Sequence, residues 1–209
     1  SIVKHDGFLD DYACLTLSLL SLYETDFEYR WLEAAEKLGD AILERFYEQK
    51  EGKFYFTQAK AENLIVRPVE AHDGATPSAS GMATTALVRL WLFTDQNHFR
   101  QAAEAVLKTY QPTMEKIPSA SGQFLIALAH LIDNPIHFVI AKGDDTENYE
   151  ALLEKIRGPF LPNKAVLQIH TQKSNPHFQG RKTDQGKTTV YVCQGQTCFP
   201  PVSAPKELE

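Results

Sequence analysis

The 209-residue chain is 43% hydrophobic and 11% aromatic, which is enough apolar surface for one or two domains with a real core. Its formal net charge of −6 argues against nucleic acid as the main partner, because phosphate binding needs a basic surface. No apolar run reaches the roughly 20 residues that cross a bilayer, and the chain does not start with a signal peptide. We therefore expect a cytoplasmic protein with no membrane partner.

Two kinds of helical segment alternate along the first two-thirds of the chain. Residues 11–23, 80–93 and 121–132 are apolar almost all round, so neighbours must cover them on most sides. Residues 27–47 and 97–110 carry a single apolar stripe with charges opposite, which is typical of outer helices. The order inner, outer, inner, outer, inner predicts a two-layer stack of about two and a half helical hairpins.

Internal repeats support the hairpin interpretation. Three short segments recur in the same order relative to the helices: Thr25-Asp26 as Thr94-Asp95, His5-Asp6-Gly7 as His72-Asp73-Gly74, and the segment 77–81 as 118–122. Common alanine-rich helices and serine caps explain part of this similarity. We expect a mainly α fold in which residues 1–133 form a partial α/α toroid.

The periodicity changes after Asp133. Residues 136–141, 164–169 and 188–193 are predicted strands, and Thr146 is expected to cap a helix that runs to Ile156. Residues 134–209 should therefore form a small α/β unit. The basic stretch from Thr171 to Lys187 is expected to be a solvated loop, with anion binding as the alternative.

A candidate site follows from the direction of the inner helices. Inner helices that are separated by outer helices run in the same direction, so their N-termini should gather at one end of the toroid. We call this end the mouth. Helix N-termini favour bound oxygens, and paired carboxylates can divide acid and base roles. Asp10 and Asp11 are the candidate catalytic residues. The candidate substrate-binding residues are His5, Tyr12, His72, Asp73 and Ser78.

Simpler interpretations exist for each of these residues. Asp10 and Ser78 stand at helix starts, as do Ser80, Ser119 and Ser121, and capping alone explains such residues. His-Asp-Gly is good turn chemistry. Because only one of the two adjacent aspartates can cap, Asp11 is left as the stronger functional candidate. His5, His72 and the nearby aspartates show no recognised ligand spacing, so we expect neither a metal nor a cofactor.

The three cysteines form neither a disulfide framework nor a zinc motif. Cys193 and Cys198 are interpreted as a thiol pair that closes the last strand, with redox or metal chemistry as the alternative. Cys14 lies within an apolar helix and is expected to be part of the core.

Three segments resemble a known family: Gly7 to Ala13, His72 to Ser78, and Cys193 to Pro201. They look like the C-terminal end of thioredoxin-domain-containing YyaL-type proteins, whose vertebrate members are called spermatogenesis-associated. The resemblance spans the whole chain. It implies an (α/α)6 toroid of the six-hairpin glycosidase kind, preceded by a thioredoxin-like domain that this sequence lacks. Five helices are too few to close such a ring.

Two functions are consistent with these patterns. The first is carbohydrate binding or processing by the carboxylates at the mouth, and it rests on the analogy of fold. The alternative is a non-catalytic interaction or scaffold module for the absent thioredoxin-like domain. A homo-oligomer could also cover core surface that an incomplete ring exposes.

Overall fold

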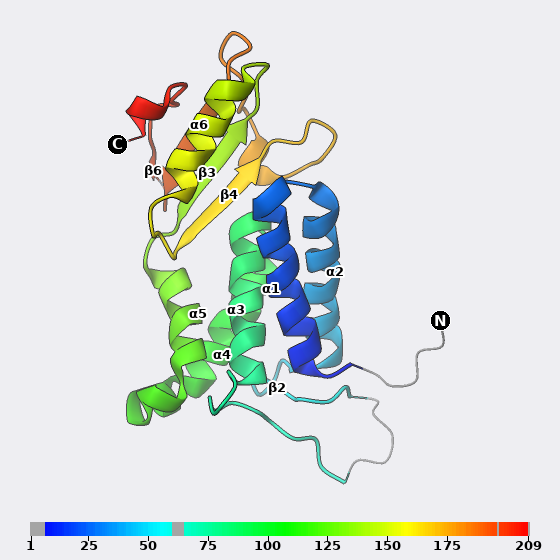
Figure 1. Ribbon diagram of the computed structural model, residues 1–209. Coiled ribbons are helices and arrows are strands. Elements are labelled where there is room, and N and C mark those ends of the chain that lie inside the picture. Colours follow the sequence, from blue (N-terminus) through cyan, green and yellow to red (C-terminus); the bar gives the residue numbers. More distant parts are fainter. Residues whose placement is uncertain (1–6, 60–64, 196, 209) are drawn as a thin grey trace. The chain divides into compact units, whose positions relative to one another are not determined.

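The computed structural model describes residues 7–59, 65–195 and 197–208 (Figure 1). The protein is mainly helical and carries a small α/β part, as predicted. Contacts divide the chain into unit 1, which comprises Ser1–Trp91 and Gln96–Leu131, and unit 2, which comprises Leu92–Asp95 and Ile132–Glu209. In the part of the chain that is described, no helix is both long and apolar enough to cross a membrane.

Unit 1 contains the five predicted helices. The inner helices are α1 (Leu9–Asp26), α3 (Ala79–Thr94, with its last turn in unit 2) and α5 (Gly122–Ile132), and the outer helices are α2 (Tyr29–Arg45) and α4 (Asn97–Lys116). A short hairpin of β1 (Tyr47–Glu48) and β2 (Lys53–Phe54) follows α2, and the sequence patterns did not predict it. Helix α4 continues through Pro112, beyond its predicted end.

The inner helices run in the same direction, as predicted (Figure 1). Near the starts of α1 and α3, the sulfur atoms of Cys14 and Met82 lie 3.6 Å apart. Further along the same two helices, Arg89 forms a 2.7 Å ion pair with Glu24. Since the early residues meet early residues and the late residues meet late ones, α1 and α3 are parallel.

Helix α5 lies on α3 with its start at the same end. The amide nitrogen of the Gln123 side chain donates to the Thr85 hydroxyl at 2.9 Å, and both residues lie in the first two turns of their helices. The predicted gathering of inner-helix N-termini is therefore confirmed for all three helices.

The three inner helices differ in how far they are covered. Nearly every side chain of α3 is buried. By contrast, Leu15 and Leu22 of α1 are 51% and 44% exposed, and Ile126 and Ile132 of α5 are 49% and 69% exposed. The expectation that neighbouring elements cover an inner helix on most sides is correct for α3. It is wrong for one face each of α1 and α5, because the described chain has nothing to place there.

The outer helices pack closely because of a glycine. Gly39 of α2 lies against the side chains of Leu90 and Phe99, where any larger residue would collide with them. Polar contacts also join α2 to the start of α4, including one of 3.0 Å between His98 and Asp40.

Unit 2 is a four-stranded sheet with strand order β4-β3-β5-β6. Its elements are β3 (Ile136–Ala141), α6 (Thr146–Arg157), β4 (Lys164–Gln168), β5 (Thr189–Gln194) and β6 (Thr197–Cys198). Strands β3 and β4 are parallel and are joined through α6, whereas β5 and β6 pair antiparallel. Helix α6 packs on the sheet, where the Tyr149 hydroxyl donates to Gln168 at 2.7 Å.

The three predicted strands and the helix of unit 2 are confirmed, but the cap of that helix is not. Thr146 is the first helical residue, and Asp145 holds the N-cap position. The Asp145 carboxylate accepts hydrogen bonds from the backbone and the hydroxyl of Thr188. Short 3-10 turns complete the structure: η1 (Pro118–Ala120), η2 (Pro176–Phe178) and η3 (Pro205–Glu207).

Candidate functional site

Asp73 is the central residue of the mouth formed by the inner-helix N-termini. Its Oδ1 accepts a hydrogen bond from the N–H of Ser78 at 2.8 Å, and its Oδ2 accepts one from the N–H of Gln123 at 2.7 Å. Its own N–H donates to the carbonyl of Ala120 at 2.9 Å. One carboxylate therefore joins the starts of α3 and α5.

The charge state of Asp73 follows from these bonds. Partial burial raises the pKa of its carboxyl group, but the N–H donors of Ser78 and Gln123 outweigh burial and leave the pKa below its ordinary value. Asp73 is consequently an ionised helix cap near neutral pH.

Of the serines expected to cap these helices, Ser121 bonds differently, and Ser80 and Ser119 do not stand at a cap position. Ser121 donates its hydroxyl to the carbonyl of Ile117 at 3.0 Å. Ser80 lies inside the first turn of α3 and is completely buried, and Ser119 is exposed within η1. The spacing of these residues did not reveal Asp73 as the shared cap, because the bond to α5 crosses a large gap in sequence.

At the start of α1 the roles of the two aspartates are the reverse of those predicted. Phe8 is the N-cap residue, and its N–H donates to Oδ2 of Asp11 at 2.8 Å. Among the described residues, the bond that Asp10 accepts is a local one, from the N–H of Asp11 at 3.0 Å. Asp11 is thus the residue that closes the first turn, and this capping role removes the reason for preferring it as a functional carboxylate.

Cys14 is an exposed free thiol one turn further along α1, so its assignment to the core is wrong. Partial burial raises the pKa of this thiol, and the negative charges of Asp10 and Asp11 raise it further. The thiol is therefore poorly suited to act as a nucleophile.

Tyr12 pairs with a residue that the sequence patterns did not indicate. Its hydroxyl accepts a 2.7 Å hydrogen bond from Arg45, at the end of α2. Arg67 lies 4.1 Å above the ring of Tyr55 and donates to the carbonyl of Thr57 at 2.6 Å. Single arginines in polar segments carry no recognisable pattern, and only the fold brings them beside the tyrosines.

The residues just before α1 and in the loop before α3 are placed as follows. The half-exposed ring of Phe8 stacks on Phe56, with the ring centroids 5.0 Å apart. His72 is exposed, and His5 lies outside the described residues. Within the described ranges, no group of three or more histidine, cysteine or acidic side chains could hold a metal ion.

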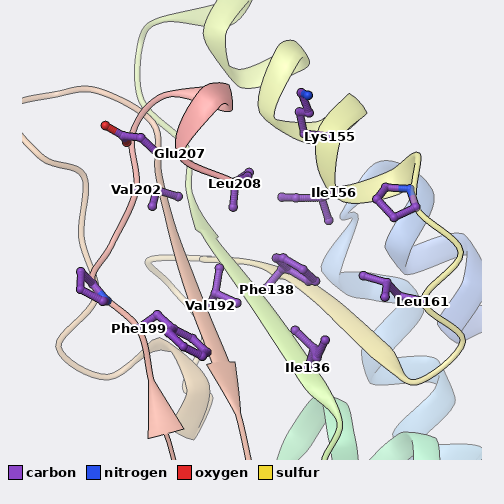
Figure 2. Close-up of a pocket in the computed structure, with 12 residues that line it drawn as sticks. Ile136, Phe138, Lys155, Ile156, Leu161, Val192, Phe199, Val202, Glu207 and Leu208 are labelled. Atoms are coloured by element: carbon purple, nitrogen blue, oxygen red, sulfur yellow. The ribbon is translucent and has the colours of Figure 1, made fainter.

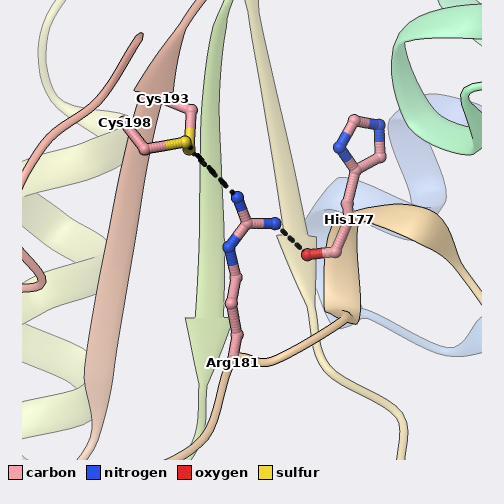
Figure 3. The surroundings of a disulfide bond; sticks show 4 residues. All are labelled: His177, Arg181, Cys193 and Cys198. Atoms are coloured by element: carbon pink, nitrogen blue, oxygen red, sulfur yellow. Dashed lines mark hydrogen bonds between the residues drawn. A yellow bond between two sulfur atoms is a disulfide. The ribbon is translucent and has the colours of Figure 1, made fainter. Parts of the chain in front are cut away.

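Unit 2 contains a second cluster of chemically active groups. Cys193 and Cys198 form a disulfide, so the expectation of a free thiol pair is wrong (Figure 3). The two residues lie directly opposite each other in the β5–β6 hairpin. The pairing of β5 with β6 brings the two sulfur atoms together. The sequence patterns did not predict this pairing.

Two histidines lie close to this disulfide. The rings of His137 and His177 stack with centroids 4.6 Å apart, and Nε2 of His137 is 2.9 Å from the carbonyl oxygen of Leu92. Burial, followed by the proximity of His137 and Arg181, lowers the pKa of His177 to about 4. Burial also lowers the pKa of His137, so both rings are neutral at pH 7.

Unit 2 also has an apolar groove of about 490 Å³ (Figure 2). Its floor includes Phe138 of β3 and Val192 of β5, and Ile156 of α6 and Phe199 form part of its walls. None of the residues that the sequence predicted as a site lines this groove.

Comparison with known proteins supports the predicted resemblance. No protein-family model matches the chain. The chain is 28% identical to human spermatogenesis-associated protein 20 and 28% identical to the mouse protein of the same name, in both cases over 97% of its own length. It is 29% identical to an uncharacterized protein of Caenorhabditis elegans, again over 97% of its length.

The chain corresponds to only part of these relatives. It covers 27% of the human protein, 26% of the mouse protein and 28% of the nematode protein, so it spans about a quarter of their length. The names of these relatives state no activity or ligand.

Proposed function

We propose that unit 1 is an arc of a larger α/α array of the toroid kind, and that it binds further helices along its two uncovered edges. The main observation is the contrast between α3, which is nearly all buried, and its neighbours α1 and α5, which expose large apolar side chains. Large apolar side chains that are exposed together on one helix are typical of a surface that another element covers.

Further hairpins of the same polypeptide are the proposed occupants of these edges. About three-quarters of each relative lies outside the region matched by this chain, which leaves ample sequence for them. Both uncovered helices belong to the inner layer, so another inner helix could continue the row at either end. A thioredoxin-like domain, or a second copy of the chain, would instead make unit 1 a scaffold module.

The double variant Leu15→Asp with Leu22→Asp tests this proposal. In the chain alone the free energy of unfolding should change by less than about 0.5 kcal/mol, because both side chains already contact water. In a polypeptide of the relatives' length it should fall by roughly 3 kcal/mol or more, because unpaired charges would be buried. Urea unfolding of both forms measures the difference.

Ile117→Asp is the matched control, since Ile117 is 47% exposed and lies in neither apolar face. Equal effects of the double variant in the short and long polypeptides would refute the proposal. Sedimentation at several concentrations distinguishes further hairpins from a second copy of the chain. A dimer that dissociates in the double variant would show that a second copy covers the apolar faces.

A second candidate function is carbohydrate binding at the mouth, which the half-exposed, stacked ring of Phe8 favours. Flat aromatic surfaces next to a few polar groups are typical of small-ligand sites. Binding is better supported than cleavage, because glycosidases need two available carboxyl groups about 5 to 10 Å apart. Here the oxygens of Asp11 and Asp73 accept bonds from backbone N–H groups at or just before the helix starts.

Titration with mono- and oligosaccharides, followed by NMR, tests this second candidate. Phe8→Ala should abolish any binding, and Phe199→Ala, which removes an exposed ring of unit 2, should not. If turnover of a glycoside is found, Asp11→Asn should abolish it. Unchanged turnover in that variant would remove Asp11 from the mechanism.

A further inference from the structure

Arg181 binds both sulfur atoms of the Cys193–Cys198 disulfide (Figure 3). Its Nη2 lies 3.0 Å from Sγ of Cys193 and 3.7 Å from Sγ of Cys198. Its Nη1 donates to the carbonyl of His177, and its guanidinium lies 5.7 Å from the centre of the Tyr191 ring. The contacts with the His177 carbonyl and the Tyr191 ring therefore help to hold the guanidinium beside the sulfur atom of Cys193.

The two cysteines differ in their access to solvent. Cys193 is 6% exposed, whereas Cys198 is an exposed residue of the edge strand β6. A thiolate arriving from solvent can therefore reach the sulfur of Cys198 more easily than that of Cys193. The arginine is closer to the buried sulfur, which would become the leaving group in such an attack.

We propose that Cys193–Cys198 is a thiol–disulfide exchange site that reacts with dithiols, with Arg181 as the positioning residue for the leaving thiolate. A thiolate of the dithiol attacks Sγ of Cys198, the Cys193–Cys198 bond breaks, and Cys193 leaves as a thiolate beside Arg181. The second thiolate of the dithiol then attacks the mixed disulfide and releases Cys198. Two electrons pass from the dithiol to the protein, and the dithiol becomes a disulfide.

The surroundings of the disulfide fit this chemistry. A leaving thiol with a low pKa accelerates exchange, and a neighbouring arginine lowers the pKa of a thiol. The nearby His137 and His177 are neutral at pH 7, so Arg181 is the cation that acts on the sulfur atoms. A purely structural role explains less, because a cross-link adds least when it closes a short loop, and β5 and β6 are already paired.

The first test identifies the sulfur that is attacked. The experiment uses the Cys14→Ser background, because an exposed free thiol could exchange with the mixed disulfide during digestion and move the glutathione label. The oxidised protein is mixed with glutathione, quenched with acid and digested, and mass spectrometry locates the mixed disulfide. We expect glutathione on Cys198. Attachment mainly to Cys193, or a disulfide that millimolar dithiothreitol does not reduce in the folded protein, would overturn the proposal.

The second test measures the contribution of Arg181. Reduction by dithiothreitol should be about three- to tenfold slower in Arg181→Gln, because the leaving thiol loses its cation. Arg181→Lys should restore part of the rate. Lys182→Gln is the matched control: it removes one positive charge from the next residue, and its rate should stay within about twofold of the unmodified protein. Equal rates in the Arg181→Gln and Lys182→Gln variants would refute the role of Arg181.

A third measurement does not depend on any variant of Arg181. In the reduced protein, the carbon-13 shift of the cysteine Cβ atoms is followed against pH. We expect Cys193 to titrate at least about one unit below the ordinary thiol value of about 8.5. A normal titration of both cysteines would contradict the proposed stabilisation of the thiolate.

Discussion

Asp73 and Gln123 are 50 residues apart in the sequence, yet the N–H of Gln123 donates a 2.7 Å hydrogen bond to Oδ2 of Asp73. The other oxygen of the same carboxylate accepts a bond from the N–H of Ser78. A side chain in the loop before α3 therefore caps α3 and α5 together. This arrangement fixes the two helices at the mouth and leaves the carboxylate little freedom for chemistry.

Replacing Asp73 should destabilise unit 1. Asp73→Ala removes both capping bonds and should lower the free energy of unfolding by about 2 kcal/mol, at roughly 1 kcal/mol for each cap. Asp73→Asn keeps one acceptor oxygen and should lose about half as much. Urea unfolding followed by circular dichroism measures both, with Glu44→Ala as the control for loss of an exposed carboxylate. A change below the control value would show that these bonds contribute nothing.

The same carboxylate predicts a dependence of stability on acid. Its pKa is lower in the folded protein than its ordinary value, so its contribution is present above that value and is lost as the pH falls through the folded pKa. Stability should therefore decrease below about pH 4, the unfolded pKa of an aspartate. Unfolding curves between pH 5 and 2.5 should fall more steeply for the unmodified protein than for Asp73→Asn. Parallel curves would contradict this assignment.

The two aspartates of α1 should contribute unequally. Asp11→Ala removes the bond to the N–H of Phe8 and should cost about 1 kcal/mol. Asp10→Ala leaves that bond in place and should cost a few tenths of a kcal/mol, through the helix dipole alone. Thermal unfolding of the pair measures the difference. A larger loss of stability in Asp10→Ala than in Asp11→Ala would show that Asp10 is the capping residue, as the sequence suggested.

Gly39→Ala should destabilise the protein although alanine favours helices. Propensity alone predicts a gain of about 1 kcal/mol in the middle of α2. The added methyl group would collide with Leu90 and Phe99, and overpacking of this kind costs about 1 to 3 kcal/mol. We expect a net loss of up to about 2 kcal/mol by urea unfolding. Gly122→Ala is the control, because its new methyl group would meet Asp73 only at an ordinary contact distance of 3.4 Å.

His177 should make unit 2 sensitive to mild acid. Its pKa is lowered by burial to about 4 in the folded protein, so below its ordinary value of 6.5 the unfolded chain binds the proton more readily. This difference should lower stability by roughly 2 to 3 kcal/mol between pH 7.5 and 4.5. In His177→Phe the loss should be clearly smaller, with the remainder due to His137. His72→Phe, at an exposed position, should behave like the unmodified protein.

The elements of the fold were predictable because each helix and strand buries its own apolar face. The alternation of all-round apolar and one-sided helices predicted the inner and outer layers of unit 1, and residues 136–141 were predicted as a strand with the bounds that β3 has. The short β1–β2 hairpin was missed, because two-residue strands carry no periodic signal.

The mouth was predictable as a location, although the roles of its residues were not. The parallel inner helices place Asp10, Asp11, Tyr12 and Asp73 at helix starts, as expected. Which carboxylate caps which helix depends on where the loops before the helices lie in the folded chain, as the bond from Gln123 to Asp73 shows. Neighbours from other segments, such as Arg45 beside Tyr12, become visible only when the chain is folded.

The sequence by itself determined the helical layers, the change to an α/β unit and the direction of the inner helices, because these depend on local periodicity and on the order of the elements. Only the tertiary structure decided that Asp73 caps two helices, that Cys193 joins Cys198 and that Arg181 lies beside them. The physical reason is that hydrogen bonds and disulfides form only between groups a few ångströms apart. The packing of segments that are distant in the sequence decides which side chains come that close.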